Sequence, residues 1–213
     1  MAEPLARAER VGRETRVSPL AAYESRFAAA TRESAGAVGL AELSFLTHLD
    51  LRVDPTSRAV DEIGQALGVP LTLSPGTSTS AGDLTVVWLG PDEWLVLAPP
   101  GQAAPLEERV RAAAGGGHVA VVDVSAQRTT VLVSGTRARD VLAHGCAIDL
   151  HPREFGTGAS ASTLLARTQV VLVAHDVDVP AYWLLVRSTF AAYLGDWLLD
   201  AATEYVVGEH TAG

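Results

Sequence analysis

Apolar and polar residues alternate along residues 43–53, and this alternation predicts a β-strand with one buried face. The apolar positions are Leu43, Phe45, Leu49, Leu51 and Val53. The residues between them, His48 included, are expected to face away from that core. The apolar spacing then becomes helical over residues 60–67, with Asp54 as the predicted N-cap and Gly68 as the predicted end of the helix.

The next segment contains a predicted loop, a hairpin and a helix. Residues 74–82 (SPGTSTSAG) show no periodicity and are mostly turn formers, which predicts a mobile loop. Two apolar runs, 84–89 and 93–98, flank the turn sequence Gly-Pro-Asp and predict a β-hairpin with a tryptophan in each strand. Pro105 is then expected to open a helix, which the glycine triplet 115–117 stops.

The stretch from residue 122 to residue 155 changes its hydrophobic period from two to about 3.6, which predicts a strand that leads into a helix. We predict strands over 119–124 and 129–133 and a helix over 136–145. A polar loop follows, whose charged or titratable side chains stand among apolar ones. These side chains are Asp149, His151, Arg153 and Glu154. They show no metal-ligand spacing and no base beside a nucleophile, so we interpret the loop as a candidate interface.

The last third repeats the pattern of the hairpin and helix. Residues 163–174 and 182–187 are predicted strands around a turn at 176–180. Residues 189–205 carry an apolar stripe at helical spacing with acidic residues elsewhere on the wheel, which predicts an amphipathic helix. Two hairpins are thus each followed by a helix. The sequence predicts an α+β fold with antiparallel sheets, packed helices and an internal duplication.

The pattern divides the chain into three parts. Residues 1–39 are expected to form a mixed-charge N-terminal arm that is partly disordered, with a short helix over 18–32. Residues 40–207 are expected to form one domain, and residues 208–213 a flexible tail. The start lacks the apolar run of a signal peptide.

Composition and charge exclude several functions. The net charge of −9 argues against a nucleic-acid partner, because phosphate binding needs clustered cations. All sixteen basic residues are arginines, so no lysine can act as a nucleophile or form a Schiff base. Cys146 is the single cysteine, which indicates a reducing compartment. No apolar run is long enough to span a bilayer. We therefore expect a cytoplasmic protein without a membrane partner.

No motif of this chain predicts a catalytic, cofactor or metal site. Residues 115–120 match G-x-G-x-x-A, but they follow a predicted helix, whereas a dinucleotide-binding motif follows a strand. The six histidines lack paired ligand spacing. Asp123 and Arg128 are placed on adjacent predicted strands around Ser125, where they could orient a carboxylate or amide ligand. The alternative is a structural ion pair across a turn.

Several ordered motifs resemble the gamma subunit of heterotetrameric sarcosine oxidase. The motifs are LGPDEWLVL (89–97), DVSAQRTTVLVSG (123–135), GCAIDLHPREF (145–155), STLLARTQVVL (162–172) and RSTFAAYLGDWLLDA (187–201). The resemblance covers roughly residues 41–206. It implies a fold similar to the folate-binding aminomethyltransferases of glycine cleavage, in an accessory and noncatalytic subunit.

The resemblance also implies partners and a reaction for the complex. Alpha, beta and delta subunits would carry FAD, FMN and NAD, with tetrahydrofolate as a co-substrate. The complex would oxidise sarcosine with oxygen and water to glycine, hydrogen peroxide and formaldehyde or 5,10-methylenetetrahydrofolate. No family residue is carried over as catalytic, cofactor-binding or metal-binding. The alternative hypothesis is a freestanding folate-dependent one-carbon transferase or folate-binding protein.

Overall fold

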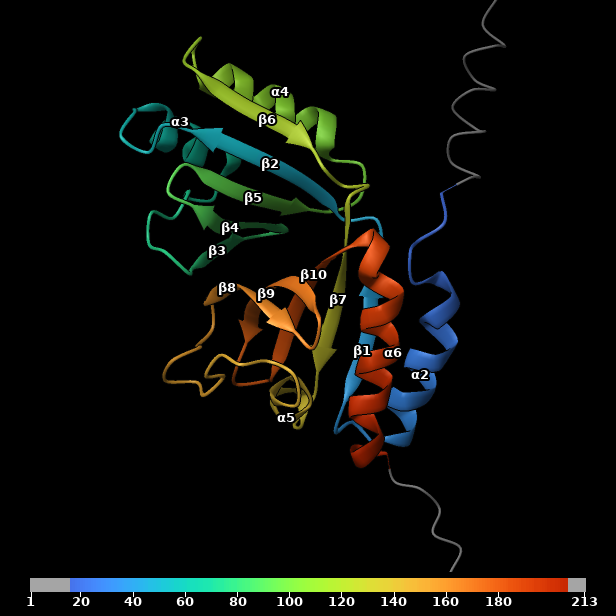
Figure 1. Cartoon of the computed structure of the whole chain (residues 1–213). Helices are drawn as coiled ribbons and strands as arrows, with labels where there is room; N and C mark the ends of the chain where they lie inside the picture. Colours follow the sequence, from blue (N-terminus) through green and yellow to red (C-terminus); the bar gives the residue numbers. More distant parts are fainter. Residues whose placement is uncertain (1–15, 207–213) are drawn as a thin grey trace, which may run out of the picture.

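Two five-stranded antiparallel sheets form the structure, a computed structural model that describes residues 16–206 (Figure 1). We call them the upper and the lower sheet after their places in Figure 1. The upper sheet has the order β3-β4-β5-β2-β6, and the lower sheet has the order β1-β7-β10-β9-β8. The predicted α+β class with antiparallel sheets is confirmed.

The upper unit is one continuous part of the chain. Its elements are β2 (Thr47–Val53), α3 (Ala59–Leu67), β3 (Ser78–Ala81), β4 (Leu84–Gly90), β5 (Glu93–Ala98), α4 (Ala103–Ala113) and β6 (Val119–Asp123). The predicted hairpin is therefore present, and Trp88 lies opposite Trp94 in it. The predicted helix end at Gly68 is confirmed by its left-handed backbone. Asp54, however, caps a separate turn by accepting the Thr56 N–H, and α3 begins only after that turn.

The lower unit combines the last third of the chain with an N-terminal piece. Its later elements are β7 (Arg128–Ser134), α5 (Ala138–Ala143), β8 (Ser160–Leu165), β9 (Thr168–Asp176), β10 (Ala181–Arg187), η2 (Ser188–Phe190), α6 (Ala191–Ala202) and η3 (Thr203–Tyr205). The N-terminal piece consists of η1 (Ala21–Tyr23), α2 (Glu24–Glu33) and β1 (Gly39–Leu43). The strand predicted over 182–187 and the final helix are thus present, whereas the strand predicted over 163–174 is divided by a turn at 166–167 into β8 and β9.

Both units contain, in the same chain order, a strand, a helix, a three-stranded meander and a second helix. A fifth strand in each unit pairs with the first strand of that unit. In the upper unit β2 lies between β5 and β6. In the lower unit β7 lies between β10 and β1, so β1 takes the place that β6 has in the upper sheet. The predicted internal duplication is present as a repeat of topology. Its second copy is completed by a strand from the N-terminal part of the chain.

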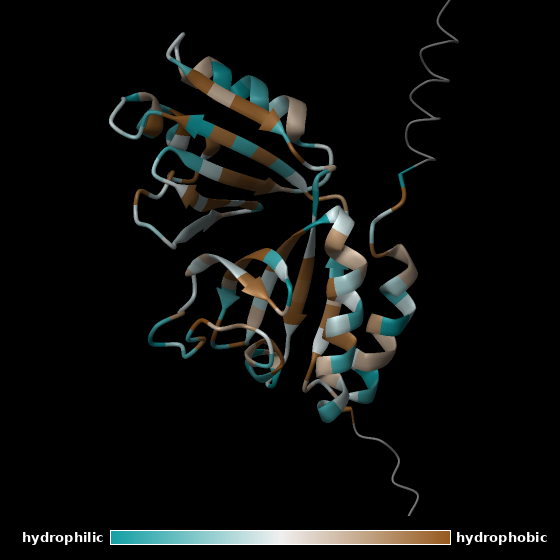
Figure 2. Cartoon of the chain, viewed as in Figure 1, coloured by the Kyte–Doolittle hydropathy of each residue, from teal (hydrophilic) through white to brown (hydrophobic). Residues whose placement is uncertain are grey.

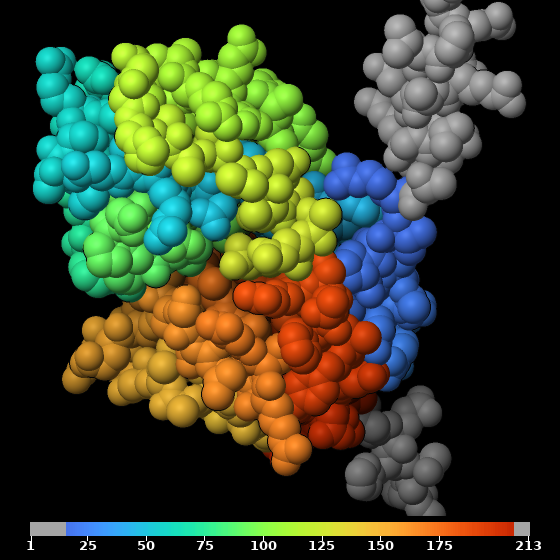
Figure 3. Space-filling view, turned by 45° about the horizontal axis from the view of Figure 1, so that its top comes forward, coloured from blue at the N-terminus to red at the C-terminus, as the bar shows by residue number. Residues whose placement is uncertain are grey.

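Three apolar cores hold these layers together. The upper core packs α3 and α4 against the upper sheet, and the lower core packs α2, α5 and α6 against the lower sheet. Figure 2 shows the matching division of the helices into hydrophobic and hydrophilic faces. A third, small core lies where the sheets face each other, and the two units meet directly in Figure 3. It consists of Val87, Leu95, Leu97, Val171, Val173 and Leu185.

The prediction of one strand over 43–53 is wrong, because the chain changes sheets within it. β1 ends at Leu43 in the lower sheet and β2 starts at Thr47 in the upper sheet. Between them, Phe45 has a positive φ of 60° and is 36% exposed. His48, predicted to face away from the core, is 1% exposed, because β2 has packed structure on both sides.

The prediction of a loop over 74–82 is wrong for residues 78–81, which form β3 and pair with β4. The backbone of this segment also joins the lower unit. Ser78 N–H donates to the Gly158 carbonyl over 2.6 Å, and Ser160 N–H donates to the Gly76 carbonyl over 2.8 Å. These hydrogen bonds tie the segment down at the edges of both sheets.

The helix expected within residues 18–32 is present as η1 and α2, and it packs into the lower core. Phe27 is 2% exposed and Leu20 is 1% exposed. Outside the core, Arg26 forms an ion pair with Asp196 of α6, with 2.8 Å between Nη1 and Oδ1. The packed chain thus begins before residue 40. Residues 1–15 and the predicted tail 208–213 lie outside the described residues.

Candidate functional site

The polar loop between α5 and β8 has a fixed conformation because its apolar residues are buried. Leu150 is 4% exposed and Phe155 is 6% exposed, and both belong to the lower core. Between them, the Phe155 N–H donates to the His151 carbonyl over 2.8 Å, which closes a single turn. We call residues 149–154 the rim loop.

The four predicted interface residues lie together on the outside of the rim loop. Asp149 Oδ1 accepts the His151 N–H over 2.8 Å, and His151 Nδ1 accepts the Arg153 N–H over 3.2 Å. All four side chains, Glu154 included, belong to exposed residues, and none forms an ion pair with another described residue. The rim loop therefore presents charges of both signs on a backbone that is anchored by the buried Leu150 and Phe155. That arrangement suits recognition of another surface, because charges at an interface set orientation and specificity.

Asp123 and Arg128 flank the second crossing between the sheets, at residues 124–127. Asp123 ends β6 in the upper sheet and Arg128 begins β7 in the lower sheet. Asp123 Oδ1 accepts hydrogen bonds from the N–H and the hydroxyl of Ser125. The structure does not join Asp123 to Arg128 by an ion pair within the described residues. Asp123 thus shapes the crossing, and the use of the two residues as a ligand-orienting pair stays a prediction.

His48 connects the two crossings between the sheets. Its backbone N–H donates to Ser125 Oγ over 3.0 Å, and its carbonyl accepts the Val124 N–H over 2.9 Å. Its Nε2 lies 3.1 Å from Thr130 Oγ1 in the lower sheet. The pKa of His48 is lowered to about 4, mainly by burial and also by the nearby Arg128, while Asp123 opposes the shift. His48 is therefore a neutral structural histidine at pH 7.

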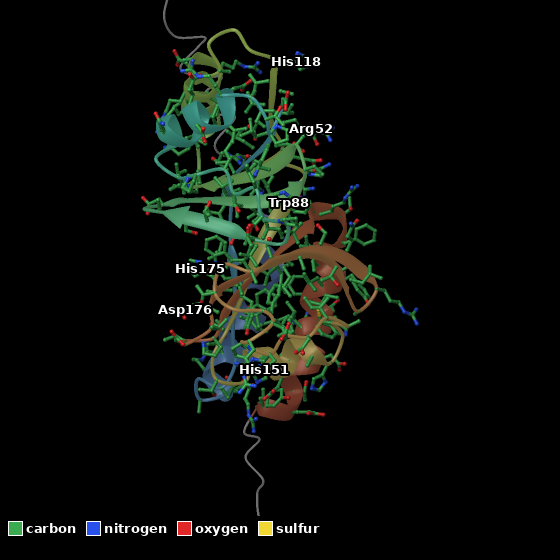
Figure 4. The ribbon with its side chains drawn as sticks, turned by 90° about the vertical axis from the view of Figure 1, so that its left-hand side faces the viewer. Arg52, Trp88, His118, His151, His175 and Asp176 are labelled. Atoms are coloured by element: carbon green, nitrogen blue, oxygen red, sulfur yellow. The ribbon has the colours of Figure 1, made fainter. Side chains whose placement is uncertain are left out.

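The histidines in residues 16–206 do not gather into a metal site. His118, His151 and His175 lie at widely separated heights in Figure 4. Within residues 16–206, no three His, Cys, Asp or Glu side chains lie close enough to hold a metal ion. The described helices are also too short or too polar to cross a membrane.

Comparisons with known proteins give the family. The model of the sarcosine oxidase gamma subunit family matches residues 52–204. The chain belongs to this family. The gamma subunit of sarcosine oxidase from Arthrobacter sp. is 38% identical over 179 residues, which is 84% of this chain and 86% of that protein. The gamma subunit from Corynebacterium sp. strain U-96 is 36% identical over 197 residues, covering 91% and 93%.

Solved structures agree with this family and with the expected fold. One chain of the heterotetrameric sarcosine oxidase from Corynebacterium sp. U-96, in complex with pyrrole 2-carboxylate, superimposes with a TM-score of 0.82 at 34% identity. The match covers 91% of this chain and 98% of that chain. The aminomethyltransferase T of the glycine cleavage system from Bartonella henselae gives a TM-score of 0.60 at 17% identity, over 80% of this chain and 48% of that chain. The predicted aminomethyltransferase-like fold is confirmed.

The gamma-family match begins within β2, so its bounds leave out η1, α2 and β1. The domain boundary predicted from the sequence, at residue 40, also leaves out η1 and α2. Neither the family match nor the hydrophobic pattern shows that β1 completes the lower sheet. β1 pairs with residues far along the chain, and such pairing produces no pattern in the sequence around β1. The rim loop, in contrast, lies wholly within the matched residues.

Proposed function

We propose that this chain is the gamma subunit of a heterotetrameric sarcosine oxidase, in which it stabilises the complex without catalysing a step. The observation that carries the proposal is the match to a chain of the Corynebacterium complex over 98% of that chain. We infer that the complex containing this chain oxidises sarcosine with oxygen and water to glycine, hydrogen peroxide and formaldehyde, or to 5,10-methylenetetrahydrofolate when tetrahydrofolate is present. Its alpha, beta and delta subunits carry FAD, FMN and NAD.

The described residues support a noncatalytic role. The candidate side chains on the rim loop include no nucleophile held by a base, and the buried His48 is hydrogen-bonded to Thr130 inside the structure. The G-x-G-x-x-A sequence follows α4 and runs into the start of β6, so it does not open a helix where a pyrophosphate could bind.

The freestanding folate-binding alternative has less support. The likeness to aminomethyltransferase T spans only 48% of that enzyme's chain, and at 17% identity it concerns the fold alone. In this chain, apolar side chains from both sheets fill the middle of the junction between the units. We therefore propose that tetrahydrofolate is used by the assembled complex and not by this chain alone.

Assembly is tested by coexpression. We expect the chain to elute together with the alpha, beta and delta subunits on size-exclusion chromatography, and to raise the thermal unfolding temperature of the complex. Elution of the chain as a separate species, with an unchanged and active remainder of the complex, would contradict the proposal.

The rim loop is the surface that we propose to contact a partner subunit. Arg153→Glu should weaken assembly by about tenfold or more, because reversing a charge places like charges opposite each other. Arg58→Glu is the matched control, since the Arg58 side chain is 93% exposed at the start of α3 in the other unit. The measurement is the subunit dissociation constant from analytical ultracentrifugation. Equal constants for the two variants would exclude the rim loop as a contact.

A further inference from the structure

A polar cavity of about 180 Å³ opens at the junction between the two sheets. Strands of both sheets line it. Its polar and charged lining residues are Glu93 from the upper sheet and Arg128, Ser162, Gln169 and Arg187 from the lower sheet. The neighbouring part of the junction is apolar, so these side chains form a separate polar compartment beside the third core.

Two arginines face the cavity from adjacent strands. Arg128 of β7 and Arg187 of β10 are direct partners in the antiparallel register of the lower sheet. Like charges at such paired positions repel each other. The Nη1 atom of Arg128 is buried, and it donates to no atom of the described protein. A buried N–H donor of a guanidinium group is costly without an acceptor, so the position of Nη1 favours an anion.

The protein supplies only part of the compensating charge. Burial lowers the pKa of Arg128, Arg187 lowers it too, and Asp50 and Glu93 oppose the shift. Glu93 lies at the same cavity, but its Oε2 is 3.3 Å from Nη2 of Arg52. Within residues 16–206, neither Arg128 nor Arg187 forms an ion pair with a carboxylate. Both guanidinium groups thus keep donors available for a ligand.

We infer that this cavity binds a small carboxylate between Arg128 and Arg187. A guanidinium group matches a carboxylate in geometry, because its parallel N–H groups can donate to both oxygens. Ser162 and Gln169 add groups that can donate to the same anion. A cavity of about 180 Å³ accommodates a small carboxylate such as acetate. The inference concerns this chain alone and does not depend on its assembly with partners.

Isothermal titration calorimetry of the full chain with sodium acetate tests the inference, with sodium chloride at equal ionic strength as the reference. We expect saturable binding of one acetate per chain, with a dissociation constant in the millimolar range because so small a ligand makes few contacts. Arg128→Gln should weaken binding roughly tenfold or more, which corresponds to one charge-assisted hydrogen bond.

Two further variants keep the test decisive if Arg128→Gln fails to fold. Arg187→Gln changes an exposed residue of the same pair and should also weaken acetate binding by several-fold. Arg167→Gln changes an exposed arginine in the turn between β8 and β9, outside the cavity, and should leave binding unchanged. The inference would be overturned by binding heats that do not saturate. It would also be overturned if the Arg167 and Arg187 variants lost acetate affinity equally. An acidic side chain of a partner would then be the better occupant.

Discussion

At the scale of single residues, His48 shows how the junction between the sheets controls ionisation. The alternation of β2 correctly placed Leu49, Leu51 and Val53 in one core. It could not place His48, because a period of two distinguishes the faces of a strand without showing that a second sheet covers the other face. The structure buries His48 there, next to Thr130, and keeps it neutral.

The buried His48 makes stability depend on pH. Its pKa is about 4 in the folded chain, against about 6.5 when unfolded, so the unfolded chain binds the extra proton first as pH falls. The stabilising contribution is complete above about pH 6.5 and is lost progressively toward about pH 4, with a total of about 3 kcal/mol. Urea denaturation across this range measures it.

His48→Gln should flatten that pH dependence, because the variant side chain does not titrate. His118→Gln is the control, since His118 is exposed. A pH profile of the His48 variant that parallels the wild type would show that other groups cause the loss of stability.

At the scale of elements, the segment around residues 76–81 shows where composition misleads. Serine, threonine and glycine predict a loop, yet β3 forms because its backbone pairs with β4 and the turn before it pairs with residues 158–160. An edge strand needs little apolar side-chain area, so hydropathy cannot reveal it. The hairpins and amphipathic helices were predictable because each buries one apolar face, and that face appears in the sequence as apolar residues at the strand or helix spacing.

Gly76→Ala should destabilise the chain more than Gly82→Ala. Both glycines have positive φ, +70° and +56°, so alanine costs about 1 kcal/mol or more at either position. Only at Gly76 would the added Cβ lie 3.2 Å from the Ser160 carbonyl, which is part of the link between the units. Thermal unfolding of the two variants measures the difference, and equal losses would show that the link contributes nothing.

At the scale of the whole molecule, the repeat of topology explains why the N-terminal part belongs to the fold. β1 fills the position that β6 fills in the upper sheet, and α2 covers it while packing beside α6. The strand–strand–helix repeat was visible in the hydrophobic pattern. The pattern did not reveal that β1 completes the lower sheet or that Arg128 lies opposite Arg187. Both features depend on pairing between strands that are distant along the chain.

Phe27→Ala tests the contribution of the N-terminal helix. Phe27 is 2% exposed in the lower core, so its truncation should cost about 3–5 kcal/mol and lower the unfolding temperature by on the order of 10 °C. Phe190→Ala is a matched control, because Phe190 is 49% exposed and should cost less than about 1 kcal/mol. Equal unfolding temperatures would mean that the N-terminal helix adds no stability.

The position of β1 in the lower sheet also sets an order of folding during synthesis on the ribosome. All strands of the upper sheet lie between residues 47 and 123, so the upper unit can fold as soon as that part of the chain has emerged. β1 emerges earlier, but its partner β7 begins only at Arg128 and the rest of the lower core later still. β1 must therefore wait for β7, and α2 must wait for α6, beside which it packs. During that interval the edge of β1 and the apolar face of α2 are open to nascent-chain chaperones.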